Sequence, residues 1–223
     1  MIRWQKEREL VLETSRELVE KGLVIGKAGN VSLRLPAEGG FASGGLAITP
    51  TSRYYESLSV EDIPVVDFDG RLVEGNLPPS SELPLHTGIY AARRGINAVI
   101  HSHSTYASAI AVAGLGVPAI LEEEVAFLGG EIQIATYAPS GSRELAANAV
   151  AALGERNAVI LANHGAVGVG RTMREALTVC ELLEQTARIY LLALAIGKVN
   201  PLPAEAVTAT TTLFRLLQSG EDL

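Results

Sequence analysis

Two histidines, His101 and His103, lie two residues apart at the end of a short apolar run, Val99-Ile100. In a β-strand, residues i and i+2 point to the same face, so the two imidazoles would project side by side. Paired imidazoles at a strand end are typical ligands of a transition metal. A pair of structural histidines, each satisfied by hydrogen bonds, explains the same spacing equally well.

The rest of the chain limits what could complete such a site. It contains four histidines and a single cysteine, Cys180, so a metal would have to be held by imidazoles and carboxylates. His164 follows the apolar run Ala158–Leu161 and precedes a glycine, which predicts a third imidazole at a strand end. The alternative for His164 is a loop histidine that hydrogen-bonds a backbone carbonyl. The lone cysteine fits a reducing compartment, and we expect a cytoplasmic protein.

A carboxylate precedes these histidines along the chain. Glu82 and His86 are four residues apart in a segment that reads as a helix, so they share one face of it. Glu82 could act as a fourth metal ligand or as a base, whereas an exposed helix pair worth about 0.3–0.5 kcal/mol is the alternative. Three neutral imidazoles with one replaceable position are the pattern of a catalytic zinc site.

Three polar turns are candidates for binding an oxyanion. Ser80 and Ser81 open the segment that contains Glu82, and the free N–H groups and dipole of a helix N-terminus favour phosphate. Further donors could come from Gly29-Asn30 and from Thr49-Pro50-Thr51-Ser52. Ordinary capping and turn chemistry is the alternative for each turn taken alone.

Charge and composition argue against two classes of partner. The net charge is −7 and no basic run is present, which disfavours nucleic acid and anionic membrane surfaces. No stretch of 18 uncharged apolar residues could span a bilayer, and the first residues lack the apolar core of a signal peptide. Hydrophobic residues make up 48% of the chain, enough for a sizeable core and a subunit interface.

Residue periodicity and turn signals predict an α/β protein. Asp69-Gly70 predicts a two-residue hairpin, and a serine is expected to cap the helix that contains Glu82. Expected strands cover residues 31–35, 46–49, 63–68, 71–73, 98–101, 132–137, 158–161 and 166–169. Expected helices cover residues 4–21, 80–94, 104–112, 142–153, 171–196 and 204–217. Without a linker or a repeat, residues 1–223 read as a single domain, with a mixed central sheet covered by helices.

Taken together, these pieces resemble the class II aldolase/adducin family from Gly26 to about Ile196. The pieces that carry the resemblance are Gly29-Asn30-Val31-Ser32, Ile48-Thr49-Pro50-Thr51, Ser80-Ser81-Glu82 with His86, His101-Ser102-His103, and Asn163-His164-Gly165. The spacings of 19 and 21 residues from Glu82 to the two strand-end histidines are also those of the family's aldolases. The resemblance implies one α/β domain with a mixed, mostly antiparallel β-sheet covered by helices.

The resemblance also implies a ligand set and an assembly. It assigns Zn²⁺, with Mn²⁺ or Co²⁺ as alternatives, to His101, His103 and His164, and makes Glu82 a movable ligand and the acid/base. It implies a homotetramer with active sites near subunit boundaries. The implied phosphate contacts are Gly29, Asn30, Thr51, Ser52, Ser80 and Ser81.

The expected activity is that of a metal-dependent aldolase. It would cleave or form an L-fuculose-1-phosphate-like ketose, with dihydroxyacetone phosphate and a short aldehyde as the other reactants, through a metal-stabilised enediolate. A dehydratase acting on methylthioribulose 1-phosphate is the main alternative. Less favoured are a ribulose-phosphate 4-epimerase, which carries aspartate at the position of Glu82, and a non-catalytic adducin-like module.

The sequence departs from the fuculose-phosphate aldolases on the aldehyde side. A tyrosine expected shortly after Pro118 is absent, and so is a tyrosine near the C-terminus. Ser52 occupies the place of a glycine in the phosphate turn. The acidic run Glu122–Glu124 lies near the place where the dehydratases use a second glutamate, although a solvated helix start is the alternative.

Overall fold

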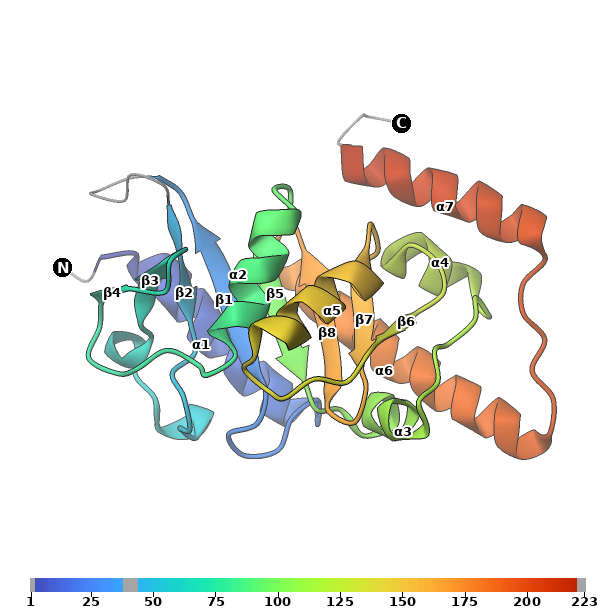
Figure 1. Ribbon diagram of the computed structural model, residues 1–223, viewed down its shortest axis with the longest axis horizontal. Helices are drawn as coiled ribbons and strands as arrows, with labels where there is room; N and C mark the ends of the chain where they lie inside the picture. The colour runs from blue at the N-terminus through green and yellow to red at the C-terminus, as the bar shows by residue number, and fades with distance from the viewer. Residues whose placement is uncertain (1–2, 38–43, 220–223) are drawn as a thin grey trace.

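Eight strands form one sheet in the part of the chain that the computed structural model describes, residues 3–37 and 44–219 (Figure 1). The strands are β1 (Asn30–Leu35), β2 (Gly45–Ile48), β3 (Val65–Asp67), β4 (Leu72–Glu74), β5 (Ala98–Ser102), β6 (Gln133–Ala135), β7 (Ala158–Leu161) and β8 (Gly165–Gly170). Their order is β4-β3-β2-β1-β5-β8-β7-β6, and all neighbours are antiparallel except β6 and β7. The expected mixed, mostly antiparallel sheet is confirmed.

The register of the central strands brings separate segments to one end of the sheet. Asn30, the first residue of β1, pairs with His101 in β5. On the other side of β5, Ser102 pairs with Ala166 at the start of β8. Because β5 is antiparallel to both neighbours, its carboxyl end lies beside the amino ends of β1 and β8. Polar residues at these strand ends are therefore gathered at one end of the sheet.

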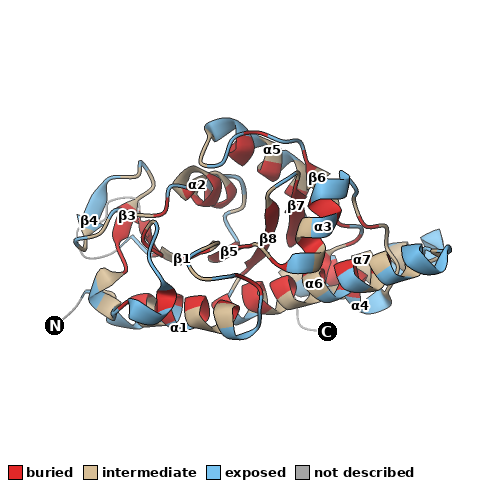
Figure 2. Ribbon diagram, turned by 90° about the horizontal axis from the view of Figure 1, so that it is seen from below, coloured by how far each residue is buried: buried red, intermediate tan, exposed pale blue. Residues whose placement is uncertain are grey.

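Helices cover both faces of the sheet, as Figure 2 shows. α2 and α5 lie over one face, and α1 and α6 lie over the other. The helices are α1 (Gln5–Glu20), α2 (Leu83–Ala92), α3 (Thr105–Ala113), α4 (Glu122–Leu128), α5 (Arg143–Leu153), α6 (Met173–Ile196) and α7 (Ala204–Ser219). β5, β7 and β8 are buried along their whole length, which explains their nearly continuous apolar sequences.

Strand β5 is anchored in both layers of the core. Val99 packs with Leu85 of α2 on one side. Ile100 packs with Leu12 of α1 on the other side, because successive strand residues face opposite ways. Full burial of one such side chain contributes about 1.5–3 kcal/mol. The strand is thus held firmly up to the residue before His101.

The last helix, α7, packs on α4 at the edge of the molecule (Figure 1). Phe214 of α7 is 3% exposed, and its ring lies against Gly129, which ends α4 with φ 90°. A Cβ atom on Gly129 would stand 2.7 Å from that ring. Gly129 therefore has two roles: it adopts the positive φ that ends the helix, and its lack of a side chain leaves room for the ring of Phe214.

Helix α2 begins later than expected. Leu83 is its first residue and Glu82 occupies the N-cap position, so the prediction of a serine N-cap is wrong. The hydroxyl of Ser80 instead accepts a hydrogen bond from the backbone N–H of Glu82 at 3.2 Å. Because of this local turn, helix α2 starts later in the sequence, and Glu82 lies at its N-terminus.

Two further local expectations are wrong. The hairpin of β3 and β4 has residues 68–71 between its strands instead of two residues. The carboxylate of Asp67 accepts backbone hydrogen bonds from Asp69 at 3.0 Å and Arg71 at 2.8 Å, which stabilises the longer turn. Helix α4 was not among the expected helices.

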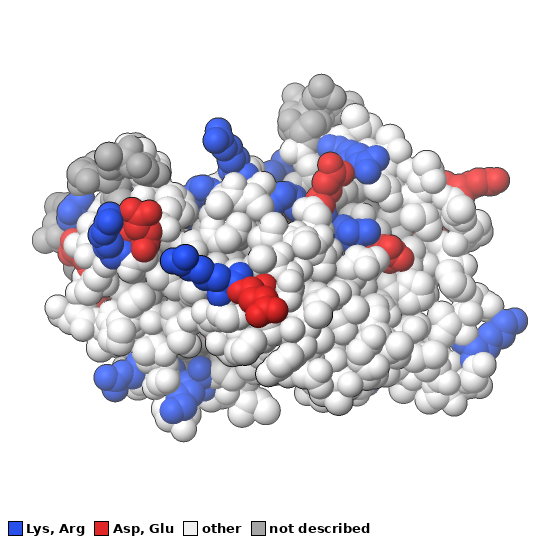
Figure 3. All heavy atoms as spheres, in the orientation of Figure 1, with Lys and Arg blue, Asp and Glu red and all other residues white. Residues whose placement is uncertain are grey.

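Charges on the visible face of the molecule are mixed in sign. Figure 3 shows lysine and arginine side chains interspersed with aspartate and glutamate, without a continuous positive patch on that face. Exposed ion pairs such as Arg71–Asp69 at 2.9 Å contribute little to stability. Among the described residues, no helix is both long enough and apolar enough to cross a lipid bilayer.

Candidate metal and acid–base site

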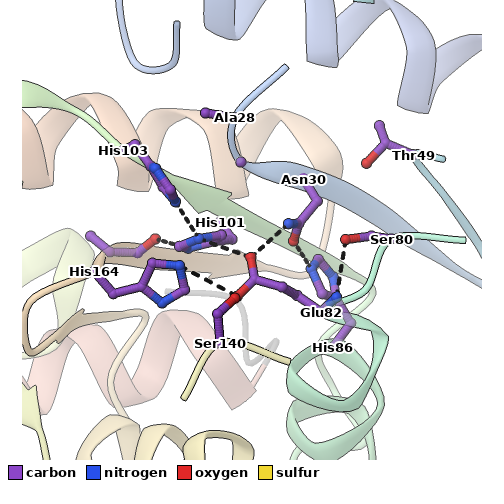
Figure 4. A network of polar contacts seen from close by, with 12 residues as sticks. Ala28, Asn30, Thr49, Ser80, Glu82, His86, His101, His103, Ser140 and His164 are labelled. Carbon is purple, nitrogen blue, oxygen red and sulfur yellow. Dashed lines mark hydrogen bonds and ion pairs between the residues drawn. The ribbon is translucent and has the colours of Figure 1, made fainter. Parts of the chain in front are cut away.

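Three imidazoles, those of His101, His103 and His164, meet at the end of the sheet (Figure 4). Nε2 of His103 lies 2.8 Å from Nε2 of His101. One ring nitrogen from each of the three lies within 4.8 Å of the others. The structure therefore brings together the three histidines that the sequence singled out.

Backbone geometry places these three rings. His103 follows β5 directly, and its N–H donates to the carbonyl of Leu23 at 3.1 Å. His164 lies in the tight turn between β7 and β8, where its N–H donates to the carbonyl of Leu161 at 3.1 Å. A Cβ atom on Gly165 would overlap the carbonyl oxygen of Ser102 and contact the rings of both strand-end histidines. Only glycine lets the turn approach β5 this closely.

Glu82 directs its carboxylate at the same cluster, as Figure 4 shows. Its Oε2 lies 3.1 Å from Nε2 of His101 and accepts a hydrogen bond from Nδ2 of Asn30 at 2.9 Å. Its Oε1 accepts a hydrogen bond from the hydroxyl of Ser140 at 2.9 Å and lies 3.4 Å from Nε2 of His164. Both oxygen atoms of this buried carboxylate thus have polar partners.

The cluster favours an ionised carboxylate on Glu82 and neutral imidazoles on His103 and His164. Burial by itself raises the pKa of Glu82, but the hydrogen bond and charge of His101, together with Asn30, hold that pKa well below its ordinary value. Burial and the neighbouring histidines lower the pKa of His103 to about 4. The same causes lower the pKa of His164. Ionised carboxylate and neutral imidazole are the forms that bind metal ions.

These donors fit a divalent metal ion. Nδ1 of His101 donates to the carbonyl oxygen of Ala166 at 3.0 Å, so Nε2 is the ring nitrogen that faces the cluster. Such an orienting hydrogen bond from the far ring nitrogen is usual for metal-binding histidines. This Nε2 faces Nε2 of His103 and an oxygen of Glu82, and a divalent cation is a group that would bind all three atoms.

His86 and Glu82 do not form an exposed pair on α2. His86 is fully buried, and burial lowers its pKa to about 3. Its Nε2 bonds Oδ1 of Asn30, and its Nδ1 lies 2.6 Å from the hydroxyl of Ser32. His86 therefore belongs to a buried network behind the carboxylate, and its ring nitrogens bond Asn30 and Ser32 instead of the three clustered imidazoles.

The three polar turns singled out from the sequence lie side by side. The N–H of Ser80 donates to the carbonyl of Thr49 at 3.0 Å, and that of Thr51 donates to Pro78 at 3.1 Å. Thr49 in turn donates its N–H to the carbonyl of Val31, just after Asn30. The predicted phosphate contacts are thus gathered beside Glu82, with the side chains of Ser52 and Ser81 exposed.

Ser52 occupies a conformation that glycine favours. Its φ is 56°, in the left-handed region, where side chains other than glycine, asparagine and aspartate are uncommon. Gly29 also has a positive φ, of 72°. Each turn thus contains one left-handed residue, the conformation that anion-binding backbone nests use.

The acidic run Glu122–Glu124 opens helix α4, away from the histidines. Glu122 and Glu123 are exposed, but Glu124 is buried and accepts hydrogen bonds from its own helix start. α4 ends beside the start of β7, where Asn157 N–H donates to Leu128 at 2.9 Å. His164 follows the other end of β7. The alternative of a solvated helix start is right for Glu122 and Glu123 and wrong for Glu124.

Some residues of the site were not found from the sequence. Ser140 lies in the turn Pro139-Ser140-Gly141 after β6, and its hydroxyl reaches Glu82. A polar turn after a strand was the available signal. The links from Ser32 to His86 and to Tyr90 span 54 and 58 residues, and no local pattern indicates them.

The sequence matches a known family over most of its length. The sequence-family model of the class II aldolase and adducin N-terminal domain matches residues 9–191 of the chain. A 5-deoxy-D-ribulose 1-phosphate aldolase of Bacillus thuringiensis serovar kurstaki is 36% identical, over 90% of this chain and 92% of that protein. The L-fuculose phosphate aldolase of Escherichia coli is 36% identical, over 86% of this chain and 85% of that protein.

A solved structure shows the same arrangement of elements. An L-fuculose 1-phosphate aldolase superimposes with a TM-score of 0.87 at 34% sequence identity. The match covers 94% of this chain and 96% of that structure. The likeness therefore extends over the strands and helices that carry the site.

Proposed function

Because the chain belongs to the class II aldolase and adducin family, we propose that it cleaves a ketose 1-phosphate between C3 and C4, and catalyses the reverse addition. The similar relatives are aldolases, which are carbon–carbon lyases, and their alignments cover most of the chain. The proposed products are dihydroxyacetone phosphate and a short aldehyde. The proposed metal is zinc, with manganese or cobalt as alternatives, held by His101, His103 and His164.

The convergence of a carboxylate on three imidazoles is the observation that carries this proposal. A structural zinc site is closed by four protein ligands, whereas a catalytic site keeps one position for exchange. Asn30 and Ser140 each hold one oxygen of Glu82, so the carboxylate keeps partners when it moves away from a metal. A non-catalytic interaction module would not require a movable carboxylate beside three imidazoles.

Glu82 is proposed as the acid/base. In synthesis its carboxylate removes a proton from the carbon of dihydroxyacetone phosphate that forms the new bond. In cleavage the C4 hydroxyl loses its proton as the C3–C4 bond breaks and the aldehyde forms, and protonated Glu82 gives one proton to C3, so no net proton is consumed. A divalent ion bound at the histidines would act as a Lewis acid for the negative charge that develops on the oxygen atoms of this fragment.

The adjoining turns are proposed to hold the phosphate. Gly29, Asn30, Thr51, Ser52, Ser80 and Ser81 are the proposed contacts. Their adjacency to Glu82 would fix the distance between the phosphate and the reacting carbon, which reduces the entropy lost on reaction. The net charge of −7 makes such localised donors necessary for an anionic substrate.

The relatives suggest two substrates that share a dihydroxyacetone phosphate half. Cleavage of an L-fuculose-1-phosphate-like sugar would release a three-carbon aldehyde. Cleavage of a 5-deoxyribulose 1-phosphate would release acetaldehyde. The dehydratase alternative receives no support from Glu124, because its carboxylate is directed at the backbone of Ile120 and Leu121.

Proton exchange tests the role of Glu82 apart from the aldehyde. Wild-type protein should exchange one carbon-bound proton of dihydroxyacetone phosphate in heavy water, as measured by NMR. Glu82→Gln should keep its fold and metal and lose at least about 100-fold in exchange rate. Glu131→Gln, which alters an exposed carboxylate, is the matched control. Normal exchange by Glu82→Gln would exclude it as the base.

The substrate is tested by product formation. Dihydroxyacetone phosphate should condense with acetaldehyde or with lactaldehyde, and the ratio of kcat/KM values identifies the preferred aldehyde. Consumption of methylthioribulose 1-phosphate without an aldehyde product would support the dehydratase instead. A cytoplasmic location stays a prediction.

A homotetramer is proposed as the assembly. Large apolar side chains are exposed near the ends of α3 and α6, among them Val112 at 69%, Leu192 at 53% and Ile196 at 84%. Subunit contacts commonly cover such side chains. Light scattering on the purified protein should give four times the mass of the chain.

A further inference from the structure

A buried series of hydrogen bonds leads from the carboxylate of Glu82 into the core, and Figure 4 shows its first members, Asn30 and His86. Asn30 Nδ2 donates to Glu82 Oε2 at 2.9 Å, and Asn30 Oδ1 bonds His86 Nε2. His86 Nδ1 lies 2.6 Å from the hydroxyl of Ser32, which lies 2.8 Å from the hydroxyl of Tyr90. We call Asn30, His86, Ser32 and Tyr90 the relay. All four are buried.

The chemistry of the carboxylate fixes the direction of the first two bonds. An ionised carboxylate only accepts hydrogen bonds, so the amide of Asn30 must present its NH₂ group to Glu82. Its Oδ1 then faces His86, and this oxygen is also only an acceptor. Nε2 of His86 must therefore carry the proton.

The remaining bonds follow from the first two. A fully buried imidazole between an amide and a hydroxyl is neutral, because burial disfavours the charged form. With Nε2 protonated, Nδ1 of His86 accepts, so Ser32 donates its only hydroxyl proton to it. Tyr90 can then donate to Ser32 Oγ, or to the carbonyl oxygens of Ser32 at 3.1 Å and Asn97 at 3.2 Å.

Every assigned donor in the relay thus points toward Glu82. Aligned hydrogen bonds polarise one another, and each becomes stronger by roughly 10–30%. The relay also joins β1, which supplies Asn30 and Ser32, to α2, which supplies His86 and Tyr90. The amide of Asn30 is held in one of its two orientations, and the reversed orientation would set two acceptors against each other.

We propose that His86 is a positioning residue for the acid/base of the reaction. Its Nε2–H holds the amide of Asn30 so that Nδ2 donates to Glu82 while the carboxylate exchanges its other contacts. This inference rests on the proposed function, in which Glu82 moves the proton. His86 itself touches neither the substrate nor the metal.

Two substitutions of His86 separate positioning from packing. Glutamine places an amide NH₂ near the position of Nε2 and can still donate to Asn30, whereas asparagine places one near Nδ1 and cannot. His86→Asn should lower kcat by about 10- to 100-fold with KM changed less than about threefold. His86→Gln should retain kcat within about fivefold of wild type. Equal kcat losses in the two variants would overturn the proposal.

Independent readouts guard against a general loss of structure. Thermal unfolding and metal content should be similar in the two variants, because the three clustered histidines are unchanged. If both variants fail to fold, Ser32→Ala and Tyr90→Phe remove outer bonds of the relay and should lower kcat by smaller factors. Unchanged kcat in both of these variants would then contradict the relay.

The tautomer of His86 can be observed without any activity. With four histidines in the chain, selective ¹⁵N labelling of histidine and long-range ¹H–¹⁵N NMR on metal-free protein should resolve each ring. His86 should be in the Nε2–H form, and an Nδ1–H form would overturn the inference. If the wild-type protein neither exchanges protons nor makes an aldol product, the proposed function fails, and the tautomer still tests the relay.

Discussion

A Cβ atom built on Gly29 would stand 2.5 Å from the carbonyl oxygen of His101, so the turn before β1 lies directly against the end of β5. Gly29 has a φ of 72°, and its carbonyl accepts a hydrogen bond from the hydroxyl of Tyr55 at 2.6 Å. The turn proposed to bind phosphate is therefore packed directly on the strand that carries the histidines, and the pairing of Asn30 with His101 joins the two.

Replacement of Gly29 by alanine should damage both stability and the site. The left-handed conformation costs an L-residue about 1–2 kcal/mol, and the contact with His101 adds to that cost. We expect Gly29→Ala to lower the free energy of unfolding in urea by more than about 1 kcal/mol. Gly95→Ala is the control, because a Cβ there meets nothing within 4 Å. Equal stabilities of the two variants would contradict this account of the turn.

Loss of one imidazole should release the metal. His103→Ala leaves two imidazoles and a carboxylate, so dialysed protein should lose a stoichiometric metal that the wild type keeps, measured by mass spectrometry of the element. His86→Gln should retain the metal, because His86 lies outside the cluster of ring nitrogens. A full complement of metal in His103→Ala would show that the ligand assignment is wrong.

Glu124 should make stability depend on pH. Burial raises the pKa of Glu124 to about 7, against the backbone hydrogen bonds of Ile120 and Leu121, which lower it. The folded protein therefore holds a proton that the unfolded chain has released, and the stability contributed by this group falls as pH rises from about 4.5 to about 7.

Glu124→Gln removes this titration. Relative to the wild type, the variant should gain up to about 3 kcal/mol in the free energy of unfolding between pH 4.5 and pH 8. Glu123→Gln changes an exposed carboxylate of the same helix and is the matched control. A constant difference for Glu124→Gln would exclude a buried, protonated Glu124.

Phe214 should control the attachment of α7. Its ring is the buried anchor of this helix against Gly129, and truncation of a buried phenylalanine costs about 3–5 kcal/mol. Phe214→Ala should raise amide hydrogen exchange across 204–219 by tenfold or more while leaving β5 and β8 protected. Leu213→Ala, at a side chain that is 39% exposed, should change exchange far less. Uniform exchange changes across the sheet would contradict a local role.

Local sequence patterns predicted most of the elements that carry the site. The apolar runs before His101 and His164 indicated buried strands, because side chains buried on both faces leave no polar alternation. Patterns within a few residues were less reliable at element starts. The N-cap of α2 is Glu82 rather than a serine, since the Ser80 hydroxyl makes a competing turn.

The sequence by itself determined which side chains could form a metal and acid/base site: a pair of histidines on one strand, a third at another strand end, and Glu82 after two serines. Residue type and short spacing suffice for that inference, because ligand chemistry and strand periodicity are local properties.

Only the tertiary structure decided how these residues meet. Because β5 lies between β1 and β8, Asn30 is beside His101 and His164 lies at the same end of the sheet. The bond between Asn30 and His86 joins residues 56 positions apart, so it depends on how α2 packs over the sheet. Burial also directs the carboxylate of Glu124 to the backbone of its own helix start. It places His86 where its ring hydrogen-bonds the side chain of Asn30. Such choices arise from packing and desolvation, which act between segments that are distant in the chain.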